Sequence, residues 1–268
     1  MLNALLRQAR ERVGYLDAAL IMAFVLHRSK ESILTARDSE TLTRAETECF
    51  MELVNERALQ KPLAYIVGKC EFMGLDFVVN EHTLIPRPDT ETVVEAALEL
   101  IRQTGIKSVL ELCTGSGCMA VSLCVLCPAE LSVTASDISA DALRTAEGNA
   151  ARHGAGVTFI LSDMFSRLDP SQYEMIIANP PYIPHDEIDA LPRGVKDYEP
   201  RAALDGGPDG LDFYRVIAEK AAGVVVLEIG YNQAGDVKNI LERNRFKELR
   251  VIKDLAGHDR VITARKNG

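Results

Sequence analysis

Short apolar runs alternate with amphipathic stretches from residue 108 to the end of the chain. Five runs of the length typical of buried strands lie at Val109–Leu112, Leu131–Ala135, Val157–Leu161, Met175–Ala178 and Val224–Ile229. Helical patterns separate them, and strands that alternate with helices form a parallel sheet. Two last runs, Leu249–Ile252 and Arg260–Thr263, have no helix between them, which indicates a closing hairpin that inserts one antiparallel strand. The pattern predicts an α/β fold with a Rossmann-like, mostly parallel sheet of seven strands.

The first 60 residues show helical spacing and no strand signal. Apolar side chains repeat every three or four residues from Leu2 to Ala9, and Asp17 is placed to cap a helix that carries Ile21 and Phe24. A Thr-x-x-Glu capping box at Thr43–Glu46 precedes another apolar helix face. We expect a small helical bundle over residues 1–64.

A different pattern joins this bundle to the α/β region. Tyr65–Gly68 and the alternating apolar residues around Gly74 predict a β-hairpin linker over residues 65–84. Prolines keep residues 84–88 extended, after which Asp89 or Thr90 is expected to cap a helix that runs through Ile101. Residues 85–268 then form the main domain.

Composition narrows the class of protein. A chain of 268 residues and 29.4 kDa can hold one large and one small domain. Its net charge of −9 and pI near 5.2 argue against a nucleic-acid backbone as the main partner. No apolar run reaches the roughly 18 residues of a membrane span, and no signal segment begins the chain. The six cysteines lack the paired C-x-x-C spacing of a zinc site, so we expect free thiols, no metal and a cytoplasmic location.

A glycine-rich turn follows the first strand of the α/β region. It carries Glu111 at the strand end, then Cys113, Thr114, Gly115, Ser116 and Gly117 before an apolar helix. The spacing fits neither a dinucleotide loop nor a phosphate loop. Glu111 would repel a pyrophosphate but attract a cationic amino group. The expected ligand is cationic, with an adenosine-like body and no phosphates, and S-adenosylmethionine fits this description.

Two later stations support a nucleoside site. Asp137 follows the second strand, where a carboxylate typically accepts both ribose hydroxyls in Rossmann-like folds. Asp163 and Met164 follow the third strand, where a polar side chain and an apolar neighbour suit the edge and face of adenine. Each aspartate alone could instead be a helix cap or a turn residue. Their occurrence after consecutive strands favours the pocket.

The fourth strand ends at Asn179-Pro180-Pro181-Tyr182. Two prolines remove the backbone donors that a strand needs, which leaves Asn179 and Tyr182 on a stiff edge suited to fixing a small conjugated group. The prolines could also serve only to end the strand. The glycine loop upstream favours the functional interpretation.

These motifs and several others resemble the family of N5-glutamine methyltransferases that modify peptide chain release factors (PrmC, also called HemK). The resemblance covers roughly residues 60–263 and is carried most specifically by Ile85-Pro86-Arg87-Pro88-Asp89-Thr90-Glu91. Further matching stretches are residues 64–68, 71–75, 179–183, 199–204, 206–211, 228–230 and 253–260. It implies a class I S-adenosylmethionine-dependent methyltransferase domain and release factors as the protein substrate. The N-terminal bundle resembles the family in kind only; because it lacks cofactor motifs and is joined by a hairpin, we expect it to recognise the release factor.

The chain departs from the family pattern in two places. Glu111 and Cys113 stand where relatives usually have Asp and Gly, so the backbone at Cys113 has to accommodate a side chain. Only Ala221-Ala222-Gly223 join the predicted helix at Phe213–Lys220 to the strand that begins at Val224, where relatives have a longer helix and turn. Either the chain has a deletion here, or the sequence lacks a flexible stretch.

The chemistry follows from the residues of the tetrapeptide. A glutamine amide nitrogen is a poor nucleophile because its lone pair is delocalised into the carbonyl. The Asn179 side-chain oxygen and the Pro180 carbonyl are placed to accept its two N–H bonds, with Pro181 stiffening the turn and Tyr182 packed against the amide plane. Both acceptors bind more strongly as positive charge develops on the nitrogen.

Two other functions remain compatible with the tetrapeptide. Adenine N6 presents the same conjugated NH2 group, so a nucleic-acid adenine methyltransferase is the alternative, although it would need a basic cleft. A non-enzymatic scaffold that binds the cofactor and translation factors is the third. We expect a monomeric methyltransferase with no direct nucleic-acid substrate and no membrane contact.

Overall fold

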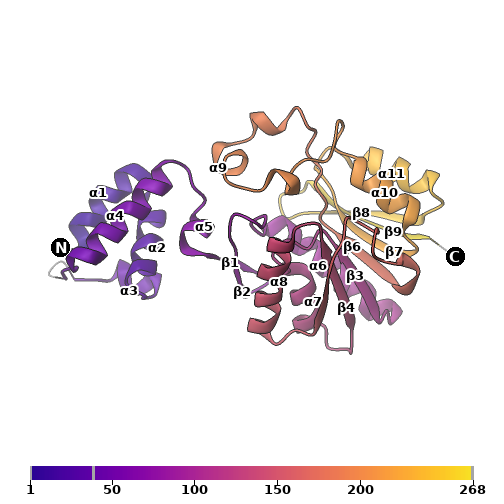
Figure 1. The fold of residues 1–268 in the computed structure, drawn as a ribbon, viewed down its shortest axis with the longest axis horizontal. Coiled ribbons are helices and arrows are strands. Elements are labelled where there is room, and N and C mark those ends of the chain that lie inside the picture. The colour runs from indigo at the N-terminus through magenta and orange to yellow at the C-terminus, as the bar shows by residue number, and fades with distance from the viewer. Residues whose placement is uncertain (1, 38–39, 267–268) are drawn as a thin grey trace. The chain divides into compact units, whose positions relative to one another are not determined.

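The computed structural model describes residues 2–37 and 40–266, which group into two compact units (Figure 1). The first unit contains the chain up to Lys69 together with Pro192–Tyr198, and the second contains Cys70–Leu191 and the chain from Glu199 onward. The segment 192–198 carries the short helix α9 (Arg193–Lys196). Its Tyr198 hydroxyl donates to the Leu59 carbonyl oxygen at 3.1 Å. By sequence alone this segment falls within the predicted main domain of residues 85–268.

Helices build the first unit, and their apolar faces share one core that includes Leu2, Ile21 and Phe50. This confirms the predicted bundle. Its helices are α1 (Leu2–Val13), α2 (Tyr15–Val25), α3 (Lys30–Leu34), α4 (Arg44–Ala58) and α5 (Leu63–Val67).

One of the two predicted caps in the bundle is confirmed. Thr43 Oγ1 accepts from the Glu46 backbone N–H at 3.2 Å, and the Thr43 N–H donates to Glu46 Oε2 at 2.7 Å, which completes the capping box. The cap predicted at Asp17 is wrong. Helix α2 already begins at Tyr15, and Asp17 pairs instead with Arg57 Nε at 2.6 Å.

The hairpin begins later than predicted. Residues 65–67 belong to α5, which starts after Pro62 and ends at Gly68 in the left-handed region (φ 71°). The hairpin consists of β1 (Lys69–Phe72) and β2 (Leu75–Val78). An apolar triplet fits either period, and here the flanking Pro and Gly decide in favour of a helical turn.

The second unit is built on a sheet of seven strands in the order β5-β4-β3-β6-β7-β9-β8. Strands β3 to β7 pair in parallel, whereas β9 is antiparallel to both of its neighbours. This confirms the predicted Rossmann-like sheet and its closing hairpin. The strands are β3 (Ser108–Leu112), β4 (Ser132–Asp137), β5 (Val157–Leu161), β6 (Met175–Ala178), β7 (Gly223–Glu228), β8 (Lys247–Lys253) and β9 (Asp259–Lys266).

Helices cover both faces of this sheet (Figure 1). Along the central strand β6, Met175 and Ile177 pack into the cluster on one face, and Ile176 and Ala178 into the cluster on the other. The first cluster includes α6 (Pro88–Thr104), α7 (Cys118–Leu126) and α8 (Ala140–His153); the second includes α10 (Asp212–Lys220) and α11 (Ala234–Arg243). Short 3-10 turns lie at Pro170–Gln172, Ile188–Ala190 and Arg201–Ala203. No helix of the described residues is long and apolar enough to cross a membrane.

The cap predicted for α6 is wrong, with a consequence for the site. The helix begins at Pro88, Arg87 occupies the cap position, and no side chain caps the first turn. Proline suits this place because its missing N–H would be unpaired anyway. Asp89 and Thr90 therefore make tertiary contacts instead.

The short connection before β7 requires a glycine at its tightest point, and Gly223 occupies that position. Gly223 has φ 69°, and a Cβ there would lie 2.5 Å from the Glu174 carbonyl oxygen. Helix α10 ends at Lys220, so only Ala221 and Ala222 separate it from the strand.

Candidate active site

The carboxyl ends of β3, β4 and β6 lie side by side, and a cavity of about 410 Å³ opens at that edge of the sheet. Ligands of open α/β sheets bind at this edge. The residues that line the cavity include Glu81, Leu84, Pro86, Arg87, Thr90, Glu111, Cys113, Thr114, Gly115, Ser116, Asp137, Ile138, Ser162, Asp163, Met164, Asn179, Pro181, Pro200, Ala203 and Phe213.

The glycine loop turns sharply between β3 and α7. Cys113, Gly115 and Gly117 all have positive φ (58°, 55° and 79°). At Gly117 a Cβ would lie 2.9 Å from that of Ala146, so the loop needs glycine there for space as well as conformation. Cys113 adopts a left-handed conformation that glycine would adopt at less cost, and burial raises the pKa of its thiol.

Glu111 is fully buried at the base of the loop. Its Oε2 accepts from the Ala120 backbone N–H at 2.9 Å. In the described part of the chain, Oε1 has no hydrogen-bond partner of normal geometry, and the same holds for the hydroxyls of Thr114 and Ser116. Burial raises the pKa of Glu111 to about 8. The Thr114 hydroxyl is near enough to lower this pKa in part, but no bond of normal geometry satisfies Oε1, so this buried oxygen beside the cavity can accept from a cationic or donor group.

Asp137 is the last residue of β4 and lines the cavity next to the glycine loop. Its Oδ2 accepts from the Gly115 N–H and its Oδ1 from the Ser139 N–H, both at 2.9 Å. Burial raises the pKa of this carboxyl. Ser139 caps α8, so Asp137 is not a helix cap; its bond to the Ser139 N–H, two residues on, is that of a turn residue, the other alternative, and the carboxyl group still lines the cavity.

Asp163 and Met164 follow β5. Met164 has a positive φ of 46°, which directs the chain back toward the glycine loop, and its sulfur lies 3.9 Å from the sulfur of Cys113. Asp163 is exposed but lines the same cavity. The residues after β5 therefore lie beside the glycine loop after β3.

Asn179 follows directly after β6 and also lines the cavity. Its Nδ2 donates to Thr90 Oγ1 at 3.2 Å, so the other end of the amide, Oδ1, is left for a different partner. The Tyr182 hydroxyl lies 3.5 Å from Glu228 Oε1, and burial raises the pKa of that hydroxyl. Gly117, Pro180 and Tyr182 are not among the residues that line the cavity; the packing of Tyr182 against an amide plane stays a prediction.

Gln233 and two glycines of the matching stretch 206–211, to which the sequence analysis assigned no role, hold the tetrapeptide in place. Gln233 Nε2 donates to the Tyr182 carbonyl oxygen at 2.9 Å. A Cβ at Gly206 would lie 2.7 Å from Tyr182 Cα, and one at Gly210 would lie 2.3 Å from the Tyr182 carbonyl oxygen. The Gly206–Leu211 stretch thus packs backbone to backbone against residues 181–182, a contact that only glycine permits.

A buried ion pair fastens the loop after β6 to the segment before α6. The Glu199 side chain is 1% exposed and accepts from the Arg87 guanidinium and, at 3.3 Å, from the Ile85 N–H. Both segments joined by this ion pair contribute cavity residues: Pro86 and Arg87 come from one, and Pro200 comes from the other.

Comparison with known proteins gives two family matches within this chain. A model of the methyltransferase small domain matches residues 91–192, and one of the PrmC N-terminal domain matches residues 2–68.

Curated relatives match over most of the chain. The release factor glutamine methyltransferase of Clostridium acetobutylicum is 38% identical over 99% of this chain and 96% of its own. That of Geobacter sulfurreducens is 44% identical over 80% of this chain and 76% of its own. Among solved structures, the hMettl16 catalytic domain superposes with a TM-score of 0.56 at 14% identity, covering 88% of this chain and 86% of that one, which supports the fold alone. The chain belongs to the release factor glutamine methyltransferase family.

Proposed function

We propose that the residues around this cavity transfer a methyl group from S-adenosylmethionine to the side-chain amide nitrogen (N5) of a glutamine in a peptide chain release factor. The observation that carries the proposal is the meeting of Glu111, Asp137 and Asn179 at one cavity. The two carboxyl groups suit the cofactor, and the amide suits the acceptor. Family membership supports the same reaction.

The residues present fit the cofactor. Glu111 Oε1 has no partner of normal geometry in the described chain, so a cationic amino group would restore the hydrogen bond that it lacks. Each Asp137 oxygen accepts one backbone N–H and keeps a lone pair, which suits two ribose hydroxyls. Asp163 and Met164 are available for adenine. When bound, the cofactor supplies a methyl group made electrophilic by its sulfonium.

The acceptor amide is held by the chain itself. Asn179 Oδ1 and the Pro180 carbonyl oxygen accept its two N–H bonds, which orients the nitrogen toward the cofactor side of the cavity. As positive charge develops on the nitrogen, both acceptors bind its hydrogens more strongly. No strong base is needed, because an alkylated amide nitrogen is acidic and loses its proton readily.

The partner of the reaction is a whole release factor, gripped by the first unit while its glutamine enters the cavity. A monomer suffices for this arrangement, and the cytoplasm, where release factors act, is the compartment that we propose. The net charge of −9 supports a protein rather than a nucleic acid as the substrate.

Mass spectrometry of the reaction products tests the proposal. Release factor incubated with the protein and isotope-labelled S-adenosylmethionine should gain one methyl group on a glutamine. Asn179→Ala is the matched control and should leave the glutamine unmodified over the same time. Adenine-containing oligonucleotides tested in parallel should stay unmodified; methylated adenine with unmodified glutamine would instead support the nucleic-acid alternative.

A further inference from the structure

A buried carboxyl group lies next to Asn179 without reaching the cavity. In the register of β6 with β7, Ala178 is paired with Leu227, so Asn179 and Glu228 are the next residues along two neighbouring strands. Glu228 is 1% exposed and is not among the cavity-lining residues. Because its carboxyl group is buried outside the cavity, any influence of Glu228 on the reaction is expected to pass through a neighbouring side chain.

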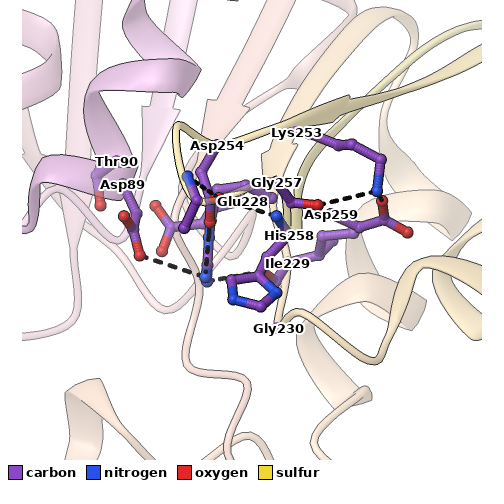
Figure 2. A network of polar contacts seen from close by, with 12 residues as sticks. Asp89, Thr90, Glu228, Ile229, Gly230, Lys253, Asp254, Gly257, His258 and Asp259 are labelled. Carbon is purple, nitrogen blue, oxygen red and sulfur yellow. Dashed lines mark hydrogen bonds and ion pairs between the residues drawn. The ribbon is translucent and has the colours of Figure 1, made fainter.

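Thr90 is the side chain that is bonded to Asn179 and also lies close to Glu228. It is 3% exposed, lines the cavity, and accepts from Asn179 Nδ2 at 3.2 Å. Figure 2 shows Asp89 and Thr90, from the first turn of α6, on one side of Glu228 and the turn between β8 and β9 on the other. The Thr90 hydroxyl is close enough to Glu228 to lower the pKa of its carboxyl. Glu228 Oε2 has no hydrogen-bond partner of normal geometry in the described chain, so it is open to the Thr90 hydrogen.

The count of hydrogens decides which way the Asn179 amide points. A hydroxyl has one hydrogen to give, and an ionised carboxylate can only accept. With Glu228 ionised, Thr90 donates to Glu228 and has to accept from Asn179, which turns Nδ2 toward Thr90 and Oδ1 toward the cavity. A substrate amide that offers N–H groups needs Oδ1 there.

A protonated Glu228 removes this constraint. It can donate to Thr90, whose own hydrogen can then point at Asn179. An Asn179 amide turned around would present Nδ2 to the cavity, a donor facing the donors of the substrate. The heavy atoms occupy the same positions in both protonation states. Only the ionised state, however, requires Asn179 to present its oxygen to the substrate.

We propose that Glu228 is a positioning residue that acts through the Thr90 hydroxyl to hold the Asn179 amide with its oxygen facing the substrate. The proposal rests on the function proposed above for Asn179. It also gives a role to Thr90, whose side chain is not used as a helix cap.

The groups around Glu228 set the pH range in which this control operates. Burial raises its pKa to about 7; Thr90 from α6, Arg260 from β9 and the hydroxyl of Tyr182 lower it, and Asp89 from α6 raises it. Arg260 is held by Asp254, from the turn before β9, at 3.2 Å and lies 3.3 Å from Asp89. The ionised form of Glu228 therefore becomes dominant as the pH rises through neutrality.

Turnover measured against pH, with saturating S-adenosylmethionine and whole release factor, tests the proposal. For the unmodified protein, kcat should fall by up to about tenfold per pH unit below pH 7 and level off above it. Glu228→Gln should lower kcat roughly ten- to a hundredfold, because its amide can offer Thr90 either a donor or an acceptor, and should abolish this pH dependence. Its affinity for S-adenosylmethionine, measured by calorimetry, should stay within about twofold of the original.

Substitutions at Thr90 separate the hydrogen bond from the shape of the side chain. Thr90→Val should lose as much activity as Glu228→Gln, whereas Thr90→Ser should retain most of it. The double variant Glu228→Gln/Thr90→Val should lose no more than either single variant, since both act through one contact. Asp89→Asn, which leaves this contact in place, should keep the plateau rate and move the midpoint to lower pH.

Three results would overturn the proposal: an unchanged pH profile in Glu228→Gln, a kcat of the unmodified protein that is constant from pH 6 to 8.5, or equal losses in Thr90→Ser and Thr90→Val. Failure of the proposed function looks different. In that case the unmodified protein leaves the release factor glutamine without a methyl group at every pH.

Discussion

Two glutamates, Glu111 in β3 and Glu228 in β7, are buried on either side of the strand that leads to Asn179. Burial raises their pKa values to about 8 and about 7, above the value near 4.3 of an unfolded glutamate. The stability that they contribute is full below about pH 4 and is lost as the pH rises through those folded values, because the unfolded chain gives up its protons first. Buried acids with this cost mark binding and catalytic sites.

The raised pKa of Glu111 predicts that cofactor binding releases a proton. At pH 7 the carboxyl of the ligand-free protein is mostly protonated, and a cationic amino group beside Oε1 favours the ionised form. Affinity for S-adenosylmethionine should therefore increase as the pH rises from 6 toward 8. Calorimetry in buffers of different ionisation enthalpy should show release of up to about one proton at pH 7.

Glu111→Gln is the control for this effect. It keeps the shape of the side chain but has no proton to lose, so binding should be weaker and independent of pH over this range. An equal proton release from the glutamine variant would assign the proton to another group.

Asn179 is the residue on which the proposed transfer most depends. Asn179→Ala should preserve the fold and cofactor affinity but reduce turnover on the order of a hundredfold or more, because a preorganised acceptor at the reacting nitrogen is lost. Asn179→Asp retains an acceptor and should keep part of the activity. Single-turnover rates of the three proteins check this, and an alanine variant as fast as the original would contradict the mechanism.

At the scale of elements, the site depends on loops that are fastened to one another. Glu199, after β6, is buried against Arg87, before α6. Arg87→Met removes one partner and leaves a buried carboxylate, which should cost about 3 kcal/mol of the free energy of unfolding. This value is at the low end for a buried pair because Arg87 is itself 38% exposed. Urea unfolding measures it.

Two variants make that measurement specific. Adding Glu199→Gln to Arg87→Met should recover part of the loss, since the charge without a partner disappears. Arg44→Met breaks an exposed pair with Glu48 and should cost no more than about 0.5 kcal/mol. A similar cost for Arg87→Met and Arg44→Met would show that the buried pair does not fasten the loops.

The sequence predicted elements well where the signal is local and poorly where a partner lies far along the chain. Strands β5 and β6 have the expected bounds, because each is a short apolar run between turn residues. Asp17 and Thr90 are residue types that commonly cap helices. Their contacts are instead with Arg57 and Asn179, which lie 40 and 89 residues away in the sequence. Gln233 and Gly210 carried no local signal of their contact with Tyr182. Such pairings depend on the fold as a whole.

At the scale of the whole molecule, the first unit is more than an N-terminal domain. Pro192–Tyr198, from within the sequence of the methyltransferase region, belongs to it. Deleting residues 1–60 would therefore also remove the partner of Tyr198, the Leu59 carbonyl. Substitutions on the surface of the bundle test its role more cleanly than a deletion does.

Tyr15 and Leu16, each 55% exposed at the start of α2, form such a surface site. Because this pair lies on the bundle that we propose to bind the release factor, we propose that it contributes to that contact. Tyr15→Ser/Leu16→Ser should raise KM for whole release factor about tenfold or more, while methylation of a short glutamine peptide and cofactor affinity stay unchanged. Val125→Ser/Leu126→Ser replaces an exposed apolar pair (40% and 39%) at the end of α7, outside the bundle, and should leave the KM for both substrates unchanged. Equal losses on protein and peptide in the Tyr15/Leu16 variant would mean that the bundle only stabilises the fold.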